Sequence, residues 1–157
     1  MLYFDGVLRT AIHALKYRNA QHLADPLGEM MGDYWRAHHI PADVIVPVPL
    51  HPSRERARGY NQSALLARRL GEITGLPIKE NLLARIRATA PQVELGAEAR
   101  RENVRGAFHC APASAAGLHV LLVDDVCTTG STLEACSQAL RAGGASSVWA
   151  LTLARAL

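Results

Sequence analysis

The order of apolar and polar positions predicts two helices near the beginning of the chain. Over residues 5–18 apolar side chains recur every three or four positions, the spacing of an amphipathic helix, and Asp5 is the candidate N-cap. A second helix is predicted over 25–35, with Pro26 in its first turn, where proline is tolerated. We therefore expect residues 1–40 to form a helical N-terminal part.

Runs of β-branched apolar residues follow, and they predict strands that are buried on both faces. One run reads V-I-V-P-V-P-L and ends in a rigid loop, because Pro47 and Pro49 cannot donate hydrogen bonds to a sheet. Two others begin at Val120 and cover 147–153, and a helix is predicted over 61–75. This alternation predicts an α/β fold with a mainly parallel sheet flanked by helices.

A polar stretch over 88–104 lies between two shorter predicted strands at 82–87 and 105–110. Its pattern is helix-poor, and unstructured loops of this length are commonly functional. We expect a mobile hood that closes over a site and excludes water. The residues there best able to contact a ligand are Gln92, Arg100 and Asn103, although Asn103 could equally cap a turn.

Composition narrows the class of protein. The 157 residues favour one domain over 1–157, and 49% hydrophobic with 20% charged residues is typical of a folded chain. No apolar run approaches the length of a membrane span and no signal peptide is evident, so we expect a cytoplasmic protein. The cysteines are odd in number and widely spaced, which predicts reduced thiols rather than disulfides or a zinc ribbon. They are Cys110, Cys127 and Cys136.

The net charge of +3 suits an anionic ligand without demonstrating one. Arginine carries much of it, and its planar guanidinium matches phosphate better than lysine does. Arg54, Arg56 and Arg58 form one cluster, whereas the arginines between residues 85 and 105 are expected to be mostly solvated surface.

The strongest chemical signal is the stretch 120–132, which reads V-L-L-V-D-D-V-C-T-T-G-S-T. Asp124 and Asp125 follow the apolar run, and a loop of small and hydroxyl residues comes next. Ser131 or Thr132 is the expected N-cap of a helix that Gly143 stops. Backbone N–H groups and hydroxyls at such a helix start can bind a phosphate, while the carboxylates can accept hydrogen bonds from sugar hydroxyls. The spacing therefore predicts a sugar-phosphate site.

Alternative interpretations exist for single members of this stretch. Either aspartate alone could be an ordinary capping residue at a strand end. Cys127 could be a nucleophile, but a small residue is needed at that place and no histidine is tied to it in sequence. His51 and His109 could serve as acid or base if a ligand lay near them.

The same stretch resembles the signature of type I phosphoribosyltransferases, which bind 5-phosphoribosyl-1-pyrophosphate (PRPP). The resemblance implies that fold, with Asp124 and Asp125 as catalytic residues that meet the ribose 2′ and 3′ hydroxyls. It also implies Mg²⁺ held by the two aspartates through water or ribose. The loop that would bind the 5′-phosphate comprises Cys127, Thr128, Thr129, Gly130, Ser131 and Thr132.

A second string resembles the ComF branch of these proteins. It reads V-P-V-P-L-H-P-S-R-E-R-A-R-G-Y-N-Q, and matches continue through Thr89, Gln92, Leu95, Arg100, Asn103, Gly106 and Phe108. Strand ends share one crevice in open α/β sheets, so we expect this loop beside the first. Its residues predicted to bind pyrophosphate are Pro47, Val48, Pro49, Arg54 and Arg58. ComF proteins commonly carry an N-terminal zinc element, but this sequence holds no C-x-x-C, so no zinc site is predicted.

Three functions remain open at this point. The first is an enzyme that transfers phosphoribose to or from an unknown acceptor. The second is a non-catalytic sensor of PRPP or a nucleotide. The third is an accessory protein of competence that meets single-stranded DNA, although few aromatic residues are present to stack bases. A homo-oligomer is compatible with all three.

Overall fold

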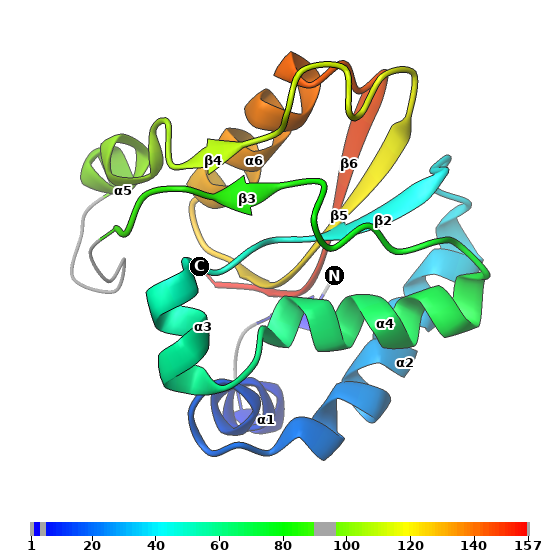
Figure 1. Ribbon diagram of the computed structural model, residues 1–157. Helices are drawn as coiled ribbons and strands as arrows, with labels where there is room; N and C mark the ends of the chain where they lie inside the picture. Colours follow the sequence, from blue (N-terminus) through cyan, green and yellow to red (C-terminus); the bar gives the residue numbers. More distant parts are fainter. Residues whose placement is uncertain (1, 4–5, 90–96, 157) are drawn as a thin grey trace.

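The computed structural model describes residues 2–3, 6–89 and 97–156, and its centre is a four-stranded parallel sheet. The strands lie in the order β1-β6-β5-β2 (Figure 1). Their bounds are Leu2–Tyr3 for β1, Val44–Pro47 for β2, His119–Cys127 for β5 and Ser147–Arg155 for β6. The sheet confirms the predicted α/β class and three of the predicted strand regions.

Strand β5 lies inside the sheet because it is apolar on both faces. Its residues 120–123 are 0% exposed and hydrogen bond with β2 on one side and β6 on the other. Successive side chains point to opposite faces, so Leu121 and Val123 join one core cluster while Val120 and Leu122 join another. The prediction of a strand buried on both faces is confirmed.

Helices α1 (Gly6–Tyr17), α2 (Ala24–His38) and α4 (Gln62–Thr74) cover one face of the sheet (Figure 1). The short helix η1 (Gln21–Leu23) connects the first two. These helices match the predicted ones to within a few residues, while Asp5, the predicted cap of α1, lies outside the described residues.

The other face packs against α6 (Ser131–Ala142) and a small antiparallel ribbon of β3 (Ala84–Arg85) and β4 (Phe108–His109) (Figure 1). Both ribbon strands fall inside the predicted strand segments but are shorter. The ribbon lies over the carboxyl ends of β2 and β5, which positions it above the predicted ligand loops (Figure 1).

Two predictions of irregular structure were wrong. No helix was predicted between the rigid loop after Pro49 and residue 61, but α3 (Pro52–Arg58) forms there. The His51 ring accepts a hydrogen bond from the N–H of Ser53 at its start, and Gly59 ends the helix at φ 89°. The helix-poor hood contains α5 (Ala97–Val104). Its alanine, glutamate and arginine residues favour a helix without an apolar stripe, so periodicity did not reveal it. Residues 90–96, including Gln92, lie outside the described part.

None of the helices in the described part of the chain combines the length and the apolar character needed to cross a lipid bilayer.

Helices α2 and α4 approach closely because glycines face the contact. A Cβ atom added to Gly28 would lie 2.6 Å from the Cβ of Arg69, and one added to Gly32 would lie 2.8 Å from Cδ1 of Ile73. The Cβ of Arg69 is fixed by its backbone and cannot rotate away. The distance between these helices is therefore set by the absence of a side chain at Gly28.

We predict that Gly28→Ala destabilises the protein by about 1–3 kcal/mol, because overpacking outweighs the better helix propensity of alanine. Urea denaturation measures the change. The reverse substitution Ala37→Gly, at an exposed position of the same helix, is the control and should cost about 1 kcal/mol from propensity alone. A Gly28→Ala protein at least as stable as the wild type would contradict the proposed close packing.

Candidate functional site

Two adjacent carboxylates are buried toward the carboxyl end of β5. Asp124 is 9% exposed and Asp125 is 2% exposed. Oδ1 of Asp124 accepts hydrogen bonds from Oγ of Ser63 at 2.8 Å and from the N–H of Asp125 at 2.9 Å. Oδ1 of Asp125 accepts one from the N–H of Val126 at 2.7 Å, and its Oδ2 lies 2.8 Å from Nζ of Lys16. The pair is thus held by α1, α4 and its own strand.

This environment changes the acidity of the groups. Burial, together with the neighbouring charge of Asp125, raises the pKa of Asp124 to about 7, although Lys16 and the Ser63 hydroxyl oppose the shift. Burial alone would lower the pKa of Lys16, but the pairing with Asp125 outweighs burial and raises that pKa. Lys16 is therefore a resident cation beside the acid pair.

The hydroxyl loop leads from β5 into α6. Gly130, at φ 80°, is the N-cap of α6, so the prediction of Ser131 or Thr132 as N-cap was wrong. The αL conformation at this turn suits glycine, and Ser131 is already the first helical residue. Oγ1 of Thr129 lies 2.7 Å from Oγ of Ser131 and accepts a hydrogen bond from its N–H. The first turn of α6 thus begins at the hydroxyl loop, as a phosphate site requires.

The R-G-Y-N-Q string holds the second loop in place. Nδ2 of Asn61 donates to the carbonyl of Val48 at 3.0 Å, while its Oδ1 caps α4 by accepting from the N–H of Ser63. The hydroxyl of Tyr60 donates to the carbonyl of Leu15 in α1. This string therefore ties α1, α4 and the V-P-V-P loop together.

An open cleft of about 1080 Å³ connects these parts. Eight predicted site residues line it, namely Val48, Pro49, Arg54, Arg58, Asp124, Asp125, Thr128 and Thr132. Cys127, Thr129, Gly130 and Ser131 belong to the same loop but do not line the cleft, and Pro47 is buried inside β2. The two loops meet at one edge of the sheet, as expected from the strand ends.

Arginines are among the residues that line the cleft, and they include Arg54, Arg58 and Arg85. Arg85 is only 8% exposed, its Nη2 donates to Oγ1 of Thr89, and its guanidinium lies 5.2 Å from the ring centroid of Phe108. Its buried Nε has no hydrogen-bond partner among the described residues. Burial and the nearby charge of Arg54 lower the pKa of Arg85. Arg85 forms no ion pair with another described residue, and an anionic ligand would supply a counterion.

Several site residues escaped the sequence-based prediction. Lys16 and Ser63 received no site role, and Arg85 was assigned to the surface. Lys16 follows the buried stripe of α1, which places it at the border of the core, but only the docking of α1 reveals the carboxylate opposite. The sequence around Arg85 gives no sign that this side chain is buried. Its burial depends on the β3–β4 ribbon, which folds over the strand ends.

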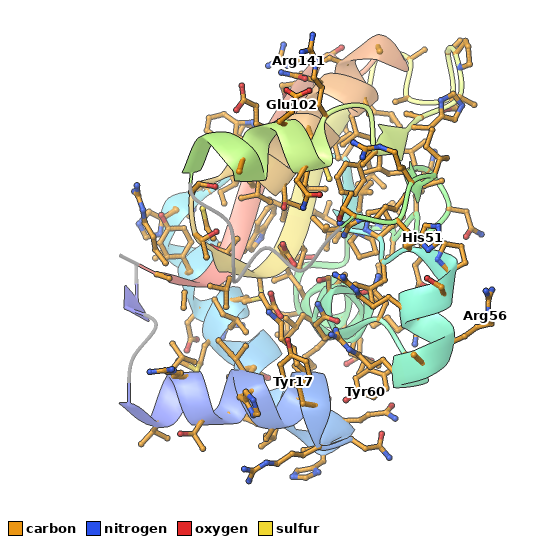
Figure 2. All side chains as sticks on the ribbon, turned by 90° about the vertical axis from the view of Figure 1, so that its left-hand side faces the viewer. Tyr17, His51, Arg56, Tyr60, Glu102 and Arg141 are labelled. Atoms are coloured by element: carbon orange, nitrogen blue, oxygen red, sulfur yellow. The ribbon has the colours of Figure 1, made fainter. Side chains whose placement is uncertain are left out.

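The remaining candidates are not among the residues that line the cleft. The His51 ring interacts with Ser53 at the start of α3 (Figure 2). Asn103 belongs to α5, and its carbonyl accepts a hydrogen bond from Arg87. All three cysteines are free thiols, as predicted, and burial raises the pKa of Cys136.

Residues 63–157, more than half of the chain, match the phosphoribosyl transferase domain family. Together with the fold, this match defines a type I phosphoribosyltransferase-like protein. The DNA utilization protein YhgH of Salmonella typhi is 36% identical over 155 residues, which cover 96% of this chain and 68% of that protein. Competence protein F of Haemophilus influenzae is 39% identical over 127 residues, covering 79% of this chain and 56% of that protein. The chain belongs to the ComF family.

A solved structure supports the fold assignment. The glutamine phosphoribosylpyrophosphate amidotransferase of B. subtilis, complexed with ADP and GMP, has a TM-score of 0.56 and 24% sequence identity. The match covers 83% of this chain and 26% of that chain. The predicted phosphoribosyltransferase-like fold is therefore confirmed.

We predict that Asp124→Asn stabilises the protein above neutral pH. The folded pKa of about 7 exceeds the usual 3.8, so the carboxyl group contributes stability below pH 4 that is lost as the pH rises to 7. The asparagine side chain keeps an oxygen that can accept the hydrogen bond from Oγ of Ser63, but it carries no charge. At pH 8 the variant should be more stable by about 2 kcal/mol, a gain of about 4–8 °C in Tm.

Thermal denaturation between pH 4 and pH 8 measures this difference. Asp33→Asn, at an exposed position of α2, is the control and should show no comparable trend. A stability difference between wild type and Asp124→Asn that stays constant over this pH range would contradict the raised pKa.

We also predict that Lys16→Met destabilises the protein by about 2 kcal/mol, because it leaves a buried carboxylate without its cation. Adding Asp125→Asn should recover part of the loss, since no charge then remains to be compensated. Urea denaturation of the two single variants and the double variant gives the coupling free energy. Additive losses would show that the Lys16–Asp125 ion pair does not stabilise the fold.

Proposed function

We propose that this protein binds PRPP, or a nucleotide with a ribose 5-phosphate group, together with Mg²⁺, and transfers phosphoribose to or from an acceptor. The observation that carries the proposal is one cleft that joins a buried acid pair, a hydroxyl loop at a helix start, and two arginines, Arg54 and Arg85, that form no ion pair with another described residue. Each group suits one part of a ribose 5-phosphate that bears a diphosphate.

The parts of the ligand are assigned by charge and hydrogen bonding. The loop 127–132 binds the 5′-phosphate with backbone N–H groups and hydroxyls. Asp124 and Asp125 accept hydrogen bonds from the ribose hydroxyls. The diphosphate lies against the V-P-V-P loop, with Arg54 and Arg85 as its counterions. Arg58, also predicted for the diphosphate, is engaged by Gln62 in this structure.

The residues of the cleft fit Mg²⁺ only in the presence of a phosphate ligand. Within the described ranges no group of three or more His, Cys, Asp or Glu side chains gathers to hold a metal. Asp124 and Asp125 supply two carboxylates, and Mg²⁺ is commonly bound by one or two carboxylates plus substrate phosphates and water. When bound, Mg²⁺ would neutralise charge on the departing diphosphate.

The transfer step needs positioning more than a nucleophile from the protein. The lone pair of the acceptor forms a bond to C1′ while the C1′–O bond breaks, and its electrons leave with pyrophosphate. A proton on the acceptor atom passes to solvent or to pyrophosphate. The acid pair holds the ribose while positive charge develops at C1′, and the two aspartates are therefore the catalytic residues of this proposal.

The names of the relatives suggest the setting of this activity. One is called a DNA utilization protein and another a competence protein. We extend the proposal to a role in DNA use or competence, with the ribose-phosphate cleft as the acting site.

Isothermal titration calorimetry with PRPP and Mg²⁺ tests the proposal. We predict that Asp124→Asn/Asp125→Asn lowers the affinities for PRPP and for ribose 5-phosphate. Arg85→Met should lower the affinity for PRPP about 10- to 100-fold but spare ribose 5-phosphate, because it removes a charge-assisted contact to the diphosphate alone. Arg56→Met is the matched control, since Arg56 points away from the cleft on the outer side of α3 (Figure 2).

Failure to bind PRPP in the presence of Mg²⁺ would overturn the proposal. If PRPP binds but no pyrophosphate is released with any of a panel of nucleobases and amines, the proposed catalytic role would be wrong. The protein would then be a sensor that uses the same site.

A further inference from the structure

Helix α1 places one ammonium group against the acid pair. Nζ of Lys16 lies 2.8 Å from Oδ2 of Asp125, and Lys16 also lines the cleft with a side chain that is 23% exposed. The ammonium group therefore contacts a carboxylate and borders the cleft at the same time. Neither signature string contains this residue, so the two binding loops do not account for it.

The position of Lys16 is fixed by the helix that carries it. Its neighbour Leu15 is fully buried in the core, and the carbonyl of Leu15 accepts a hydrogen bond from the hydroxyl of Tyr60. Ile12, one turn before Lys16, belongs to the same core cluster. The last turn of α1 cannot move Lys16 away from the acid pair without losing these contacts.

Lysine is rare in this chain. Of its 17 lysine and arginine residues, only Lys16 and Lys79 are lysines, and Lys79 is exposed. The guanidinium group of arginine is a broad planar fork, whereas the ammonium group of lysine is a compact charge with three donors. The residue at the acid pair thus carries the cation that leaves more room beside the carboxylates for a ligand.

Three of the four oxygens of the acid pair already have partners. Oδ1 of Asp124 accepts hydrogen bonds from Ser63 and from a backbone N–H, Oδ1 of Asp125 accepts one from a backbone N–H, and Oδ2 of Asp125 pairs with Lys16. A divalent cation bound directly to this pair would have to displace the ammonium group or meet its positive charge at close range. Mg²⁺ also gives up its water reluctantly. Without a phosphate ligand, the acid pair is therefore a poor site for Mg²⁺.

A ribose hydroxyl meets no such conflict. A hydroxyl group can donate a hydrogen bond to a carboxylate and accept one from an ammonium group at the same time. Lys16 can therefore supply at the sugar the positive charge that a divalent cation would otherwise bring.

We propose that Lys16 is the resident counter-cation of the ribose subsite, so that ribose 5-phosphate binds without Mg²⁺ and the metal enters only with a diphosphate. This inference rests on the proposed function, because it places the ribose at Asp124 and Asp125. It adds to the site a binding residue from α1, and it makes the acid pair selective for a sugar over a free divalent cation.

The first test is isothermal titration calorimetry of the wild type with ribose 5-phosphate, in EDTA and in millimolar Mg²⁺ at matched ionic strength. We predict that the two affinities agree within about threefold. A larger gain in Mg²⁺ would overturn the inference. If ribose 5-phosphate binds in neither buffer, the proposed function itself fails.

The second test uses Lys16→Met, which leaves two carboxylates without their cation and opens its place to Mg²⁺. We predict that millimolar Mg²⁺ alone raises the Tm of this variant by about 3 °C or more, as expected when free Mg²⁺ exceeds its Kd about tenfold. The wild type should not respond. Ribose 5-phosphate should also bind the variant more tightly in Mg²⁺ than in EDTA. A purely structural role of Lys16 would produce neither response.

Three further variants serve as controls. Lys16→Arg keeps a cation and should not respond to Mg²⁺, and Lys16→Met/Asp125→Asn should lose the response with the second carboxylate. Lys79→Met is the matched control, because Lys79 is exposed and does not line the cleft. If Lys16→Met responds to Mg²⁺ no more than the wild type does, the inference is overturned while the proposed function stands. If this variant does not fold, the comparison of the two buffers with the wild type decides the inference.

Discussion

The burial of two adjacent carboxylates is the constraint on which the rest of the cleft depends. Ionised carboxylates side by side repel each other and lose hydration, so they persist in a protein only with donors or cations around them. Strand β5 supplies backbone N–H groups, α4 supplies Ser63, and α1 supplies Lys16. The same contacts dock both helices on the sheet. The ligand-binding edge and the helical layer are therefore one unit.

Two arginines of the cleft lack the charge compensation that the acid pair has. Arg85 is buried, and neither Arg85 nor Arg54 forms an ion pair with another described residue. Two close guanidinium groups without a counterion cost stability, and proteins tolerate such costs mainly where a function requires them. PRPP bound here would place its diphosphate at these cations and its 5′-phosphate at the hydroxyl loop, so the two ends of the ligand would meet different groups of the cleft.

Part of the sequence that carries the ComF resemblance maintains the architecture around the cleft. In the R-G-Y-N-Q string, Tyr60 and Asn61 have structural roles. The Tyr60 hydroxyl hydrogen bonds to a carbonyl of α1, and the Asn61 side chain hydrogen bonds to a carbonyl of the V-P-V-P loop. Fold alone does not define an activity, and a shared scaffold can hold different acceptors. Helix α1, which lies outside both signature strings, also lines the cleft and brings Lys16 to the acid pair.

The sequence by itself determined the α/β class, the main strands, and the two loops of the cleft, because apolar runs, proline stops and the acid pair are local signals. It missed α3 and α5, whose polar residues lack an apolar stripe, and it misplaced the cap of α6, where a backbone turn at Gly130 decides the start. Only the tertiary structure brought Lys16, Ser63 and Arg85 to the site. Their roles depend on partners about 30 to 110 positions away in the chain, and no periodicity within a segment encodes such contacts.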